Sequence, residues 1–111
     1  CIEIDGQPRV ASASNDHTVR VWDPTSGATA AVLKGHTSWV RGVAWGEIDG
    51  QPRVASASDD ATVRVWDPAS GATVTVLAIM RPCHTVALRR DRLAIGTDRG
   101  VIGLRFLTDS R

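Results

Sequence analysis

The 111-residue sequence predicts an all-β fold made of repeated antiparallel sheets, and an internal repeat is the main evidence for it. Segment Glu3–Leu33 recurs 44 positions later as Glu47–Leu77, with only five differences between the copies. Within the repeat, two runs with alternating apolar residues, Val54–Ser58 and Thr62–Trp66, flank a short Asp-rich break. This pattern predicts a β-hairpin. Because self-similarity at a fixed period is typical of stacked repeat architectures, several sheets should follow one another along the chain.

Further motifs in the repeat resemble those of the WD40 family. A Gly35-His36 pair, a strand ending in Val43-Ala44-Trp45, the Asp-rich turn and the terminal Trp66-Asp67 stand at the spacing of this family. The repeat length also fits the roughly 40–45 residues of one four-stranded propeller blade. The resemblance is strong from about residue 9 to residue 77, and it points to the bacterial type with near-identical tandem repeats. It implies a WD40-type β-propeller segment of about two and a half four-stranded antiparallel blades.

This resemblance divides the chain into three blades. We expect a partial blade at residues 1–34 whose first strand is missing, a complete blade at 35–77 and a degenerate terminal blade at 78–111. These blades should supply three, four and three strands. The expected strands are Arg9–Ser14, Thr18–Trp22, Thr29–Leu33, Trp39–Gly46, Pro52–Ser58, Thr62–Trp66, Thr73–Leu77, Val86–Leu88, Arg92–Thr97 and Val101–Phe106.

In the third blade the motif's polar residues are lost. If Asp98 is matched to Asp60, Leu104 occupies the Trp66 position and Ala94 occupies the position of Ser56. Terminal repeats that depart from the consensus are common in repeat arrays. We therefore expect this blade to keep the strands of the family without its polar network.

Composition and charge argue against several classes of partner. Thirteen basic and twelve acidic residues leave a net charge of +1, which gives no electrostatic reason to expect a nucleic acid or a membrane. The sequence has no apolar stretch long enough for a membrane span and no basic signal region. Its two cysteines, Cys1 and Cys83, form no disulfide framework and no metal-ligand spacing. We expect free thiols in a cytoplasmic protein that holds no metal and no cofactor.

Polar residues of the repeat are the first candidates for a site. The candidates are His36, Ser56, Asp60 and Trp66, with Ser12, Asp16 and Trp22 as the copies in the first blade. A serine, a histidine and an aspartate invite the interpretation of a nucleophilic triad. Recurrence in successive blades instead favours scaffolding, and the WD40 resemblance implies that these residues form a hydrogen-bonded network within each blade.

A second group of candidates would face solvent. The resemblance implies that partners bind on the face with the interblade loops, where Trp39, Arg41, Asn15 and Asp59 are expected. An aromatic residue beside an arginine is typical of an interface anchor. The alternative for Trp39 is packing against the neighbouring blade.

These features together favour a non-catalytic scaffold for protein–protein contacts, although a fold does not fix a function. The protein partner is unknown, and we expect the ring to be completed by self-association or by other propeller segments. Three alternatives stay open: an enzyme that uses the propeller channel, a propeller that binds a small ligand or glycan, and an engineered or excised fragment with no role beyond self-assembly. The absence of Tyr and the single Phe argue against repeated aromatic ligand pockets.

Overall fold

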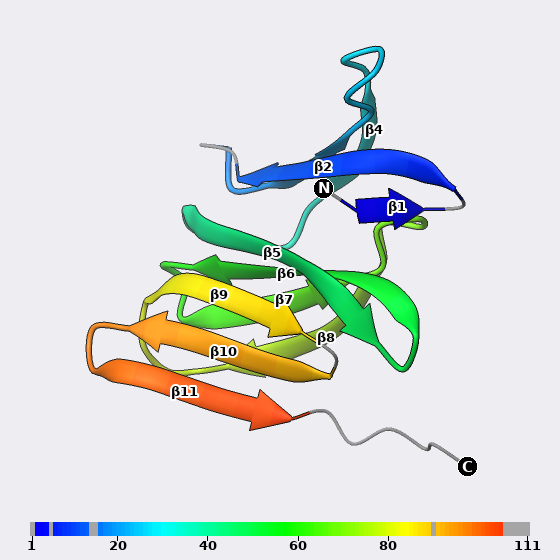
Figure 1. Ribbon diagram of the computed structural model, residues 1–111. Helices are drawn as coiled ribbons and strands as arrows, with labels where there is room; N and C mark the ends of the chain where they lie inside the picture. Colours follow the sequence, from blue (N-terminus) through cyan, green and yellow to red (C-terminus); the bar gives the residue numbers. More distant parts are fainter. Residues whose placement is uncertain (1, 5, 14–15, 90, 106–111) are drawn as a thin grey trace.

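The chain folds into three antiparallel β-sheets, which confirms the expected all-β class (Figure 1). The computed structural model describes residues 2–4, 6–13, 16–89 and 91–105. The first sheet contains β1 (Ile2–Ile4), β2 (Gln7–Ala13), β3 (Val19–Trp22) and β4 (Thr29–Leu33). The second contains β5 (Val40–Ile48), β6 (Gln51–Ser58), β7 (Thr62–Trp66) and β8 (Thr73–Ala78). The third contains β9 (Cys83–Arg89), β10 (Arg92–Thr97) and β11 (Gly100–Arg105).

Strand order within each sheet follows the chain. Each strand pairs with the next one along the sequence, as in a β-meander, and the three sheets are joined by the links between β4 and β5 and between β8 and β9. In Figure 1 the second sheet (green) lies between the first (blue) and the third (yellow to orange). No helix in the described part of the chain could cross a membrane.

The first sheet corrects one expectation. Its first strand was expected to be missing, yet β1 pairs with β2 from the partners Ile2 and Arg9 to the partners Ile4 and Gln7. This strand has three residues, whereas its counterpart β5 has nine. The described sheets therefore have four, four and three strands, and β1 is the shortest strand of the first sheet.

The register of the third sheet corrects a second expectation. Leu104 pairs with Leu93 as Trp66 pairs with Val54, so Leu104 does stand at the Trp66 position. The same register puts Ile95, and not Ala94, at the position of Ser56. The turn between β10 and β11 has two residues, whereas the turn between β6 and β7 has three. This missing residue shifts β10 by one place, and a one-residue shift reverses the face on which each side chain lies.

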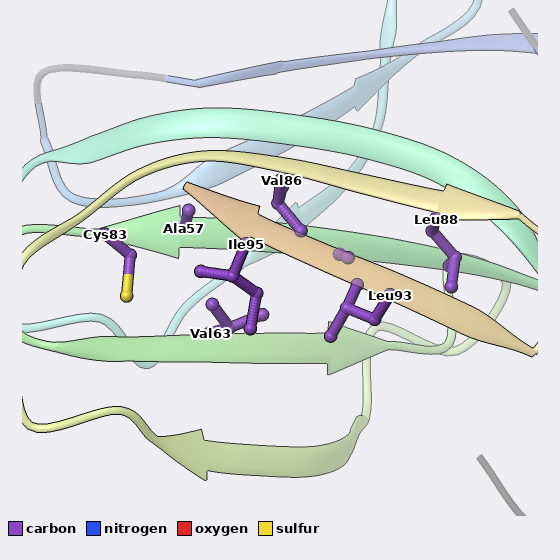
Figure 2. Packing of buried hydrophobic residues seen from close by; sticks show 8 residues of the cluster. Ala57, Val63, Cys83, Val86, Leu88, Leu93 and Ile95 are labelled. Atoms are coloured by element: carbon purple, nitrogen blue, oxygen red, sulfur yellow. The ribbon is translucent and has the colours of Figure 1, made fainter. Parts of the chain in front are cut away.

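The second sheet is largely buried on both faces in β6 and β7, where the other two sheets cover it, whereas β8 is largely exposed. Val54 and Trp66 pack toward the first sheet and have no exposed surface. On the opposite face, Ala57 and Val63 pack against the third sheet, where Figure 2 shows Ile95 of β10 next to them. Alternation along each strand thus supplies one apolar set to each neighbour.

Glycine allows the second and third sheets to approach closely. A Cβ atom on Gly46 of β5 would lie 2.6 Å from Cγ of Leu88 and 2.8 Å from its carbonyl oxygen in β9. On the same strand, a Cβ atom on Gly42 would lie 3.1 Å from Cα of Thr85. Larger side chains on this face would separate the sheets, so these glycines fix the spacing between them.

The outer sheets each have one uncovered face. Val10 in the first sheet is 37% exposed, whereas Val54, the same residue of the repeat in the second sheet, is 0% exposed. In the third sheet, Ala94 is exposed, whereas its counterpart Ala55 in the second sheet is fully buried. The molecule is a flat plate of 41 × 39 × 19 Å, and the first and third sheets stand at its opposite ends (Figure 1). The faces that are uncovered at these two ends correspond to faces of the second sheet that the neighbouring sheets cover.

Candidate functional site

The structure joins the four candidate residues of the second sheet in one hydrogen-bonded chain. His36, in the link before β5, has Nδ1 2.9 Å from Oδ2 of Asp60 and Nε2 2.6 Å from Oγ of Ser56. Trp66 then donates its indole N–H to the same Ser56 oxygen at 2.9 Å. The link between the first two sheets is thereby tied to β6, to β7 and to the turn between them.

Donors and acceptors match along this chain when His36 is neutral. Its Nδ1 faces a carboxylate, which can only accept, so Nδ1 carries the proton. Nε2 must then accept a hydrogen bond from the Ser56 hydroxyl, which leaves the serine oxygen to accept from Trp66. His36, Ser56 and the Trp66 indole N–H therefore all have partners within this network, and an unpaired buried polar group would be costly.

Asp60 is the most heavily bonded residue of the network. It accepts from the backbone N–H of Thr62 at 3.0 Å, from the hydroxyl of Thr62, and from the backbone N–H of Thr37 at 3.0 Å. Burial on its own would raise the pKa of Asp60, but these hydrogen bonds and the His36 contact outweigh it and hold the pKa at about 2. The carboxylate is therefore charged at neutral pH. Its hydrogen bonds close the turn between β6 and β7.

The burial and hydrogen bonding of Ser56 prevent it from acting as a nucleophile. Burial lowers the pKa of His36 below its ordinary value of 6.5, although the Asp60 carboxylate opposes the effect. A neutral histidine beside serine and aspartate is formally the arrangement of a triad. However, Ser56 has no exposed surface, and its oxygen is held by both His36 and Trp66. A substrate has no access to this hydroxyl. The described residues also contain no group of three side chains that could hold a metal ion.

The first sheet holds a divided version of the network. Trp22 donates its indole N–H to Ser12 at 2.7 Å, as in the second sheet. Asp16 accepts from the backbone N–H of Thr18 at 3.2 Å and forms an ion pair with Arg20 at 2.9 Å. In the second sheet the corresponding aspartate, Asp60, contacts His36 where Asp16 contacts Arg20.

Three of the four surface candidates form a compact exposed cluster, which we call the Trp39 cluster and define as Trp39, Arg41 and Asp59. Arg41 donates from Nε at 2.9 Å and from Nη2 at 2.8 Å to the same oxygen of Asp59. Its guanidinium carbon lies 5.4 Å from the centre of the Trp39 ring. The fourth candidate, Asn15, lies outside the described residues.

Trp39 combines an exposed side chain with a fixed backbone. The large apolar side chain of Trp39 is 55% exposed. Its carbonyl oxygen accepts from the hydroxyl of Ser58 at 2.9 Å and from the backbone N–H of Asp59 at 3.0 Å. The exposure runs against the alternative that Trp39 packs into the neighbouring blade. The ring is thus presented to solvent from a rigid position.

Sequence reasoning missed Ser58 and Thr62, which hold the site together, whereas it predicted that the aliphatic stem of Arg64 covers surface between the blades. Ser58 connects the buried network to the Trp39 cluster, because its hydroxyl donates to the Trp39 carbonyl oxygen and accepts from the backbone N–H of Asp60 at 3.1 Å. Thr62 donates its backbone N–H to Asp60 within the network. The guanidinium carbon of Arg64 lies 5.8 Å from the centre of the Trp66 ring. A Cβ atom on Gly35 would lie 2.7 Å from Nη1 of Arg64. Threonine two residues after an aspartate is a turn signal that was present in the sequence.

Comparison with known proteins gives three findings. The sequence matches the family described as WD domain, G-beta repeat over residues 4–23 and 27–67. It is 54% identical over 37 residues to Ribosome assembly protein 4 of Chaetomium thermophilum, covering 33% of this chain and 7% of that protein. It is 47% identical over 38 residues to the Lissencephaly-1 homolog of Branchiostoma floridae, covering 34% of this chain and 9% of that protein. The matched part therefore spans less than a tenth of either relative, and the bacterial type stays a prediction.

Proposed function

The chain belongs to the WD40 repeat family, and we propose that it acts as a non-catalytic scaffold for protein–protein contacts. The observation that carries this proposal is the Trp39 cluster, an exposed aromatic ring held on a rigid backbone beside an oriented arginine. Tryptophan and arginine are the residue types that contribute most to binding at protein interfaces. A fixed position reduces the entropy that such a side chain loses on binding.

The chemistry of the cluster suggests how a partner would bind. Arg41 is neutralised by Asp59, so the cluster offers an apolar ring with hydrogen-bonding groups around it and little net charge. Such a surface suits a protein segment with an apolar side chain to place against the ring. The name of one relative, Ribosome assembly protein 4, supports a role in a macromolecular assembly. The identity of the partner does not follow from it.

We further propose that the chain has no catalytic activity and lies in the cytoplasm. The inaccessible Ser56 hydroxyl supports the first point, because the network has no free nucleophile. Cys83 supports the second, since it is a buried free thiol whose pKa is raised by burial. A reducing compartment keeps such a thiol unpaired.

The open ends of the plate lead to a proposal about assembly. Blades in typical propellers number about four to eight, and each covers its neighbours. Here Val10 and Ala94 are exposed at positions where the second sheet has the fully buried residues Val54 and Ala55. We propose that other propeller segments complete the ring. In their absence, copies of the chain should associate weakly through the same faces.

The proposed binding surface is tested by affinity capture with Trp39→Ala. Val74→Ala is the matched control, because Val74 is also an exposed apolar residue, at 47%, but lies on β8. We expect Trp39→Ala to lose the proteins that the unchanged chain retains, with an unchanged circular dichroism spectrum, and Val74→Ala to keep them. Equal capture by both variants would refute the role of Trp39. A loss of folded signal in Trp39→Ala would show that the residue is structural.

A further inference from the structure

Strand pairing aligns three arginines in one row at one end of the third sheet. Arg92 of β10 is the register partner of Arg89 in β9 and of Arg105 in β11. The same row of the second sheet contains Gly46, Arg53 and Asp67, where the arginine and the aspartate lie 4.0 Å apart.

Consequently, a row that carries one positive and one negative charge in the second sheet carries three positive charges in the third. Like charges directly opposite each other in a sheet are destabilising. All three arginines are exposed, and none forms an ion pair with a described residue. We call them the arginine row, defined as Arg89, Arg92 and Arg105.

Next to the arginine row lies an apolar floor made of very small residues. Ala94 is the register partner of Ala87 on one side and of Gly103 on the other. With the arginines, these residues line a hollow of about 470 Å³ on the outer face of the sheet. A Cβ atom added to Gly103 would meet nothing within 4 Å, so this floor is uncovered in the described chain.

The uncovered floor continues an interface that the chain already uses. In the second sheet the corresponding face carries Ala55, which is fully buried because β9 lies over it. There, small residues such as Gly46 admit the Leu88 side chain of the neighbouring sheet. The third sheet keeps small residues on the same face. In Figure 1 this sheet stands at the other end of the molecule from the first.

We propose that this outer face binds a β-blade of another propeller segment whose covering face carries carboxylates at the end that meets the arginine row. The blade's apolar side chains would rest on the alanine and glycine floor. Its carboxylates would pair with the guanidinium groups, which bind carboxylates in a bidentate manner. This inference rests on the proposal that other segments complete the ring. It adds the chemistry that selects them.

A second copy of the chain fits this face less well. The face that its first sheet would offer contains Val10 and Trp22, which suit the floor. The described carboxylate on that face is Asp16, which already pairs with Arg20. A phosphate group or a nucleic acid would satisfy the arginines but would leave the apolar floor uncovered.

The test uses the full chain and a fluorescent six-residue peptide, Glu-Val-Glu-Val-Glu-Val, which mimics a strand with carboxylates and apolar groups on its two sides. Binding is followed by fluorescence anisotropy at constant ionic strength. We expect Arg92→Glu to weaken binding about tenfold or more, because a charge-assisted pair becomes a repulsion. The matched control is Arg99→Glu, an exposed arginine in the turn of the same hairpin, which should change binding less than about twofold.

A second variant separates docking on the face from pairing at the free edge of β11. Gly103→Leu fills the floor without changing the charge, and the open space at Gly103 permits the side chain. We expect it to weaken peptide binding, whereas a peptide added at the strand edge would bind it unchanged. Circular dichroism establishes that each variant is folded.

Four results would overturn the proposal: no binding of the peptide, equal loss in Arg92→Glu and Arg99→Glu, unchanged binding to Gly103→Leu, or displacement of the peptide by inorganic phosphate or a short oligonucleotide. If the peptide does not bind but Arg92→Glu abolishes self-association, the occupant is a second copy and the proposal is wrong. These outcomes are independent of the Trp39→Ala capture experiment, because the two surfaces share no residue. Failure of one therefore leaves the other result interpretable.

Discussion

Removing the Asp60 carboxylate tests the buried network most severely. Asp60→Ala would leave the Nδ1–H of His36 and the backbone N–H of Thr62 without their acceptor. The Asp60 side chain is only 7% exposed, so water replaces these bonds poorly. An unsatisfied buried donor costs about 1–3 kcal/mol, and two such donors give a loss of about 2–6 kcal/mol in the free energy of unfolding.

The neighbouring residue provides the matched control for this prediction. Asp59→Ala removes the carboxylate that pairs with Arg41 at the surface, and exposed ion pairs contribute little to stability. Thermal unfolding followed by circular dichroism should show a midpoint about 10 °C or more lower for Asp60→Ala than for Asp59→Ala. Asp60→Asn, which keeps one oxygen acceptor, should fall between them. Equal midpoints for the two alanine variants would refute the reasoning.

The same carboxylate predicts a dependence of stability on pH. The folded pKa of Asp60, about 2, lies below the ordinary value of 3.8. Between these values the unfolded chain binds more protons than the folded chain, so the stabilisation is complete above pH 3.8 and is lost as the pH falls toward 2. Urea unfolding of Asp60→Asn across this range should show a shallower acid decline than the unchanged chain. An identical decline would show that other carboxylates cause it.

Two further predictions follow from the buried histidine and the close sheet contact. Because burial lowers the pKa of His36, the chain should lose stability as the pH falls below 6.5. In urea unfolding, His36→Gln should remove this loss of stability, whereas the control His84→Gln, at an exposed histidine, should leave it unchanged. Gly46→Ala should destabilise the chain by about 1–3 kcal/mol in urea unfolding, because its Cβ would overlap Leu88. Gly103→Ala, at an open position, should be neutral, and equal effects of the two alanines would contradict the proposed contact.

The sequence contained enough information for the fold class and for the composition of the buried network. A near-identical repeat made the second sheet a template for the first, so strand positions followed from alternation. Prediction failed where the repeat decays. The turn between β10 and β11 is one residue shorter than its counterpart, which moved Ile95 to the position expected for Ala94. A single omitted turn residue leaves no other mark on the apolar pattern.

Other features depended on pairing between strands and were invisible along the chain. Arg92 and Arg105 are thirteen positions apart in sequence, and only the register of the third sheet aligns them with Arg89. Exposure of Trp39 also required the structure, because the sequence allowed a buried or an exposed ring. Hydrogen bonds from Ser58 and Thr62 use small polar residues that are common in turns, so the sequence did not distinguish them from ordinary turn formers.

The uncovered faces of the first and third sheets predict that this chain associates in solution as an open propeller segment. Sedimentation velocity over a range of protein concentrations tests this claim directly. The exposed apolar faces at both ends of the plate predict reversible association that increases with concentration, since burial of apolar surface is favourable by roughly 25 cal/mol per Å². A compact species of 11.8 kDa at every concentration, with a cooperative thermal transition, would contradict the claim.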